Sequence, residues 1–91
     1  MLPFTGTSAG GQTKDIAIGE DAIGTVIDVR GFSIHSDHVE LLPYVHASNI
    51  AYQKSVTVRS LNSSPYVQII HGSSAGSPNG GYVVIEYTLP T

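Results

Sequence analysis

Histidine and aspartate gather in one short polar segment, and these side chains could bind a metal. His35, Asp37 and His38 stand together in the segment H-S-D-H. Imidazole and carboxylate groups can ligate a divalent ion, but on a strand the two rings of His-x-x-His point to opposite sides. A polar turn would let both rings converge, and a solvated turn without metal explains the same residues. The sequence therefore predicts no metal and no other cofactor, and these three residues are the metal-ligand candidates.

The remaining acids and hydroxyls show no catalytic pattern. Serine, histidine and aspartate are abundant, but no Gly-x-Ser-x-Gly segment joins a strand to a helix, as the elbow of a hydrolase requires. Glu86 stands between two apolar residues of an expected strand, so we expect it to face solvent or to pair with Arg30 or Arg59. The glycine-rich segment 72–81 lacks the lysine and the following helix of a phosphate-binding loop. We expect a protein that is not an enzyme.

Tyrosines beside short polar residues are the candidates for ligand recognition. A tyrosine ring stacks on the apolar face of a sugar, and its hydroxyl bonds to sugar hydroxyls. Tyr44, His46, Asn49 and Tyr52 follow one another closely, and no long basic side chain stands among them before Lys54. These groups suit a neutral or mildly charged saccharide. The alternative is that the strand tyrosines pack in the core with their hydroxyls at its rim.

The composition is typical of a small, weakly charged β-domain. The chain has 91 residues, no cysteine, 12% charged side chains and a net charge of −3. This balance argues against nucleic-acid binding, which needs a basic face, and it excludes disulfides and cysteine-bound zinc. We also expect no membrane insertion and no secretory signal. A domain of this size is marginally stable alone, which favours oligomerisation.

Alternating apolar residues predict one all-β domain over residues 1–91, with residues 1–12 as an extended or flexible lead-in. Its pattern of about six strands is typical of an antiparallel β-sandwich or barrel. The expected strands cover residues 13–18, 25–35, a short part of 39–47, 55–60, 66–71 and 81–88, and a further short strand could cover 49–52.

Two strand candidates have unusual apolar patterns. In 25–35, Ile27 and Val29 share one face, whereas Phe32 and Ile34 share the other. A change of face along a strand requires an extra residue, so we expect a β-bulge or bend at Gly31. The segments 66–71 and 81–88 are apolar on both faces, which places them at the centre of a sandwich or against another subunit.

Five segments in order carry a resemblance to a known class. They are T-G-T-S-A-G-G-Q-T-K-D-I-A-I, G-T-V-I-D-V-R-G-F, L-L-P-Y-V, V-T-V-R-S and the ending G-G-Y-V-V-I-E-Y-T-L-P. Together they resemble the C-terminal tip domains of bacteriophage tail-fibre and receptor-binding proteins. The resemblance implies a homotrimeric β-sandwich of the virion that binds a host cell-surface saccharide and contacts other virion proteins. The alternative is a structural virion protein, such as a capsid decoration or a trimerisation and folding module, with no small ligand.

The sequence departs from that class in two respects. Fibre shafts carry long repetitive or coiled-coil segments, and this chain has none. Some fibre tips hold iron through His-x-His pairs, whereas this chain has His35-x-x-His38. The resemblance therefore implies no metal here.

Overall fold

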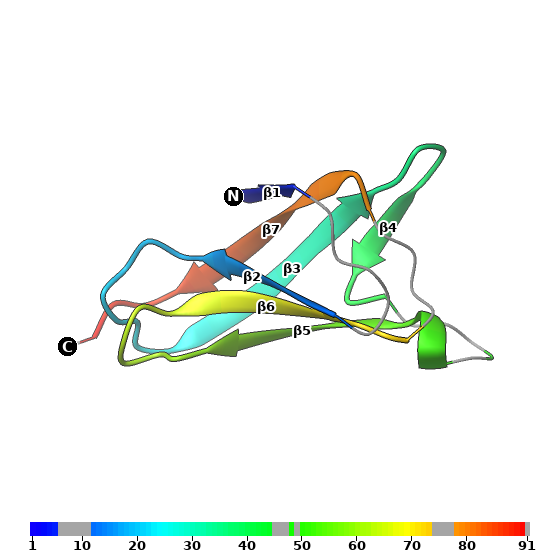
Figure 1. Cartoon of the computed structure of the whole chain (residues 1–91). Coiled ribbons are helices and arrows are strands. Elements are labelled where there is room, and N and C mark those ends of the chain that lie inside the picture. The colour runs from blue at the N-terminus through cyan, green and yellow to red at the C-terminus, as the bar shows by residue number, and fades with distance from the viewer. Residues whose placement is uncertain (6–11, 45–47, 49, 74–77, 91) are drawn as a thin grey trace.

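Two antiparallel β-sheets, packed face to face, form the computed structural model of the protein (Figure 1). The structure describes residues 1–5, 12–44, 48, 50–73 and 78–90. The predicted all-β antiparallel sandwich is thereby confirmed. The strands are β1 (Leu2–Thr5), β2 (Thr13–Ala17), β3 (Val26–Ile34), β4 (Val39–Leu42), β5 (Lys54–Arg59), β6 (Tyr66–His71) and β7 (Gly80–Tyr87), and a short 3₁₀ helix η1 (Ile50–Tyr52) precedes β5.

The strand order places the most apolar segments inside the sheets. The four-stranded sheet has the order β1-β7-β3-β4, and the three-stranded sheet has the order β2-β6-β5. Strands β6 and β7 therefore each have neighbours on both sides, as their doubly apolar pattern predicts. Strands β1 and β2 are edges, and β1, which the sequence analysis did not predict as a strand, pairs with β7.

The core between the sheets is aliphatic. Ile16, Val67 and Ile69 from the three-stranded sheet pack with Leu42 and Val83 from the four-stranded sheet. Each such side chain stabilises the fold by about 1.5–3 kcal/mol when it is fully buried. This shared core is what holds the two sheets together.

The outer face of the four-stranded sheet is also apolar. Phe32 pairs with Leu41 of β4 on one side and with Tyr82 of β7 on the other. The rings of Phe32 and Tyr82 lie 5.4 Å apart between centroids. Leu41 is 74% exposed and Val39 is 56% exposed. Contiguous apolar residues on an outer face indicate an interaction surface. We call Phe32, Ile34, Val39, Leu41 and Tyr82 the outer apolar face.

The β-bulge predicted at Gly31 is wrong. Strands β3 and β7 pair in unbroken register across Gly31, and the register shifts instead between Val26 and Asp28. Phe32 and Ile34 lie on the opposite face from Val29 because they are three and five residues further along a regular strand, and both faces of the sheet carry apolar side chains here. The expectation that Ile27 and Val29 share a face is also wrong, because beside this shift Ile27 is 63% exposed whereas Val29 packs against the core. Past Val29, an outer apolar face explains Phe32 and Ile34 without an extra residue at Gly31.

Gly31 is required by the close approach of its neighbouring strand. A Cβ built on Gly31 would lie 2.3 Å from the carbonyl oxygen of Tyr82 and 3.0 Å from the Cα of Val83. Both atoms belong to the backbone of β7, so neither can move aside without disturbing the ladder. Gly31 is buried at this position.

Two other expectations meet different outcomes. The short strand suggested over residues 49–52 is wrong for its described part, because Ile50–Tyr52 form the 3₁₀ helix η1. Asn49 itself lies outside the described residues. Glu86 pairs with Arg30 at 3.5 Å, as expected, and Arg30 also pairs with Asp28.

Among the described residues, no helix has the length and apolar character needed to cross a membrane.

We expect Gly31→Ala to destabilise the protein by about 1–3 kcal/mol, because the added methyl group meets backbone atoms of β7. Urea unfolding followed by circular dichroism measures this loss. Ala17→Val adds carbon atoms at an exposed strand position and serves as the matched control, with little expected change. Equal stability of Gly31→Ala and the parent would show that the two strands do not approach as closely as described.

Candidate functional site

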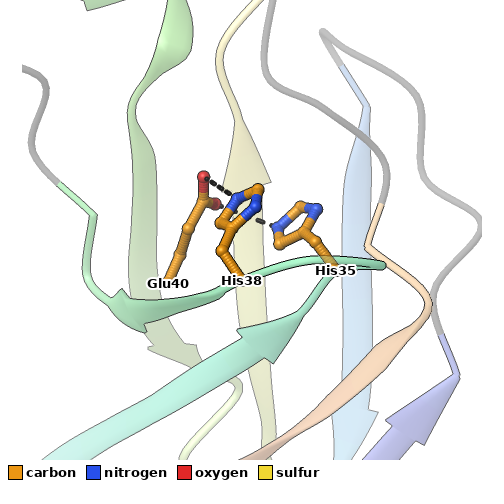
Figure 2. Close-up of side chains that lie close together, drawn as sticks. All are labelled: His35, His38 and Glu40. Carbon is orange, nitrogen blue, oxygen red and sulfur yellow. Dashed lines mark hydrogen bonds and ion pairs between the residues drawn. The ribbon is translucent and has the colours of Figure 1, made fainter.

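A cluster of His35, His38 and Glu40 lies at the turn between β3 and β4 (Figure 2). One potential ligand atom from each residue lies within 4.8 Å of the others. Nε2 of His35 is 3.1 Å from Oε1 of Glu40, and Nε2 of His38 is 3.3 Å from Oε2 of the same carboxylate. The two rings stack with centroids 4.5 Å apart and planes 5° from parallel. Two imidazoles therefore share one carboxylate.

The turn brings the two rings together. His35 follows the last residue of β3, and His38 precedes the first residue of β4. The backbone N–H of His35 donates to the carbonyl of His38 at 2.9 Å, which closes the turn. The sequence analysis expected a turn here that would let the rings of His-x-x-His converge, and the structure has this turn. Glu40 was not among the predicted metal ligands, and it completes the cluster from β4.

Asp37 orients the ring of His38 from outside the cluster. Oδ1 of Asp37 lies 2.6 Å from Nδ1 of His38. Its hydrogen bond and that of Glu40 raise the pKa of His38 above the ordinary 6.5. The same contact with His38 lowers the pKa of Asp37. Asp37 therefore contributes no atom to the cluster of three. Its contact with Nδ1 orients the His38 ring so that Nε2 faces Glu40.

A buried lysine reaches the cluster from the opposite sheet. Lys54 is the first residue of β5, and its side chain is only 1% exposed. Its Nζ donates to Oε1 of Glu40 and to Oγ of Ser33 at 3.4 Å, and it also lies 3.2 Å from Nε2 of His35. An ammonium has three N–H groups and no lone pair. Nε2 of His35 can accept from this ammonium in one tautomer or donate to Oε1 of Glu40 in the other, but it cannot do both at once.

Glu40 remains ionised in this partly buried setting. Burial acts to raise the pKa of its carboxyl group, but the hydrogen bond and charge of Lys54, with help from His38, outweigh burial and lower it. A buried charge without a partner would be costly, and truncation of one partner typically costs about 3–5 kcal/mol. The pair of Lys54 and Glu40 satisfies this requirement for both residues.

The sequence contained a signal for Lys54 and Glu40 that the analysis did not use. Lys54 has the same strand parity as Val56 and Val58, which pack against the core. Glu40 likewise has the parity of the buried Leu42. Residues of equal parity share a face. Both charged groups were therefore directed inward by the strands that carry them, and across the core each meets the other.

His71 lies on the inner face of β6, beside Lys54 in the strand register. It is 4% exposed, and its Nδ1 donates to the carbonyl of Gln12 at 3.2 Å. Burial is the main cause that lowers the pKa of His71, and the charge of Lys54 adds to it. In this position the neutral imidazole is the favoured form.

The predicted saccharide-binding residues have different locations. Tyr44 is half-buried, and its backbone exchanges two hydrogen bonds with Lys54, at 2.9 and 3.0 Å. Tyr52 is 43% exposed on η1. His46 and Asn49 lie outside the described residues. Of the four, the structure places Tyr44 in the wall of a groove.

This groove has a volume of about 290 Å³ and runs beside the bridge that links β5 to residue 44. We call it the Tyr44 groove. Residues from the adjacent ends of β5 and β6 line it together, and the sequence analysis did not identify these residues because only strand pairing brings them side by side. The lining residues are Pro43, Tyr44, Gln53, Lys54, Ser55, Ile70, His71 and Gly72.

A larger hollow of about 490 Å³ lies between the edge strands β1 and β2, away from the histidine cluster. Phe4 and Ile16 are among its lining residues, and its charged side chains are Lys14 and Asp15. Volume alone does not identify a ligand site. The lining of the smaller Tyr44 groove includes residues with an aromatic ring, an amide and a hydroxyl, which is the more specific arrangement.

No match to this chain was found among protein families, curated proteins or solved structures. A function for the chain therefore has to be argued from the geometry of its described residues.

We expect His38 and His71 to titrate on opposite sides of 6.5. The fold favours charged His38, so its contribution to stability is present below pH 6.5 and is lost as pH rises through the raised pKa. The fold favours neutral His71, so its contribution is present above pH 6.5 and is lost as pH falls through the lowered pKa. Ring chemical shifts from NMR measure both titrations, and the urea-unfolded chain is the control. Coinciding titrations in the folded protein would contradict these environments.

Proposed function

We propose that this chain is a non-enzymatic adhesion domain of a bacteriophage virion that binds a host cell-surface saccharide in the Tyr44 groove. The observation that carries the proposal is the composition of that groove. Tyr44 brings an aromatic ring to its lining, while Gln53 and Ser55 bring short hydrogen-bonding groups. Saccharide recognition uses this combination of an aromatic surface and a few convergent polar groups.

The charge distribution favours a neutral saccharide over an anionic polymer. Of the described residues that line the groove, Lys54 is the cationic one, and its ammonium is bonded to the Glu40 carboxylate. The favoured neutral form of His71 adds no positive charge at neutral pH. A polyanion would need unpaired cations to replace its counterions.

Homotrimer formation is the second part of the proposal, and the outer apolar face supports it. Leu41 and Val39 are largely exposed there, beside the aromatic pair of Phe32 and Tyr82. Packing of three copies through this face would remove apolar surface from water. Three grooves on one particle would also raise a weak affinity per site through effective concentration.

The same outer apolar face favours the second candidate function, a structural virion module without a small ligand. Such a module needs the self-association surface but not the groove. Saccharide binding therefore separates the two candidates, whereas trimer formation is common to both.

We expect the parent protein to bind saccharides on an array of bacterial surface polysaccharides, and Ser55→Trp to lose this binding because the indole fills the groove. Thr57→Trp is the matched control, since Thr57 is exposed on the same strand and does not line the groove. It should bind as the parent does. Melting curves establish that both variants fold. Absence of saccharide binding by the parent would leave the structural module as the function, and equal binding by Ser55→Trp would exclude this groove.

We expect light scattering to give a mass about three times the monomer mass of 9.6 kDa. Leu41→Lys should shift the protein to monomers, because it places a charge at an exposed position of the outer apolar face without touching the core. Thr57→Lys makes the same change on the other sheet and should remain trimeric. A parent that stays monomeric over a wide concentration range would contradict the proposal.

A further inference from the structure

We infer that His35, His38 and Glu40 form a binding site for a divalent transition-metal ion such as Zn²⁺, a role separate from saccharide binding. Two imidazole nitrogens and one carboxylate oxygen are a donor set that Zn²⁺ accepts readily. Their donor atoms already lie within 4.8 Å of one another, on a tight turn and the start of β4. A fourth position is left for water.

The distance between two of the donors fits a shared ion. Nε2 of His38 and Oε2 of Glu40 are 3.3 Å apart. Ligands at bond lengths of 2.0–2.1 Å around a tetrahedral Zn²⁺ are separated by about 3.3–3.4 Å. His38 and Glu40 thus already span one edge of the coordination polyhedron.

Asp37 supplies the outer support that metal-binding histidines usually have. When Nδ1–H of His38 donates to Asp37, the ring turns a lone pair on Nε2 toward Oε2 of Glu40. Two facing lone pairs repel, and a cation between them removes the repulsion. A carboxylate behind a ligating imidazole fixes its orientation and raises its basicity. A proton on Nε2 satisfies the same contact, so protons and metal compete for this nitrogen.

Lys54 determines how many ligands the ion can engage at once. Its ammonium binds Oε1 of Glu40 and Nε2 of His35, and leaves Oε2 to the metal. The ion therefore binds first to His38 and Glu40. His35 joins when the ammonium withdraws and the two stacked rings rotate apart. The nearby positive charge repels the ion, so Lys54 limits the affinity of the site.

Isothermal titration calorimetry with ZnCl₂ at pH 8 tests this inference on the whole chain. We expect the parent to bind one Zn²⁺ saturably, and His38→Ala and Glu40→Gln to abolish this binding. Asp37→Asn, at an exposed position that should not affect folding, should weaken it about tenfold or more. Asp28→Asn removes an exposed carboxylate elsewhere on β3 and should leave the affinity unchanged.

Lys54→Met tests whether Zn²⁺ binds beside the buried ammonium or at an exposed histidine away from it. Loss of the ammonium should tighten Zn²⁺ binding by at least about tenfold, because one cation no longer repels another at close range. The absorption spectrum of bound Co²⁺ should then indicate tetrahedral coordination. If Lys54→Met does not fold, Asp37→Asn decides the question. Absence of saturable Zn²⁺ binding by the parent, or affinities that Asp37→Asn and His38→Ala leave unchanged, would overturn the inference.

Discussion

The ion pair of Lys54 and Glu40 is the interaction on which the polar end of this sandwich depends. It joins β5 of one sheet to β4 of the other across the space between them. Neither charge could remain there alone, because an unpaired charge in a largely buried setting is costly. The pair therefore fixes the relative position of the two sheets at this end, in addition to the aliphatic contacts of the core.

Two sites share Lys54. Through its backbone, Lys54 pairs with Tyr44 and forms one side of the Tyr44 groove. Through its side chain, it holds the Glu40 carboxylate against which the rings of His35 and His38 are placed. A change in the position of Lys54 would consequently alter the groove and the histidine cluster together. The position of Lys54 is set by strand pairing, because its backbone pairs with His71 of β6 on one side and with Tyr44 on the other.

The strand pattern could be predicted closely, whereas contacts between strands could not. Alternation of Val56 and Val58 with polar residues located β5 because a strand repeats its faces every two residues, a local property. The error at Gly31 has the opposite origin. Period-two alternation shows that Phe32 and Val29 lie on different faces, but it does not show that the second face is apolar as well. The glycine is required by the backbone of β7, some fifty residues later in the chain.

By itself, the sequence determined that the protein is all-β, where most strands lie, and that His35 and His38 would not meet on a strand but could meet at a turn. Each of these follows from interactions between residues near one another in the chain. The tertiary structure decided which acid and which cation join that turn, and which polar groups line the Tyr44 groove. Those choices depend on the register of β3 with β4 and of β5 with β6, and on the packing of one sheet over the other. Lys54 became an internal cation because the opposite sheet presented Glu40, Ser33 and His35 to it.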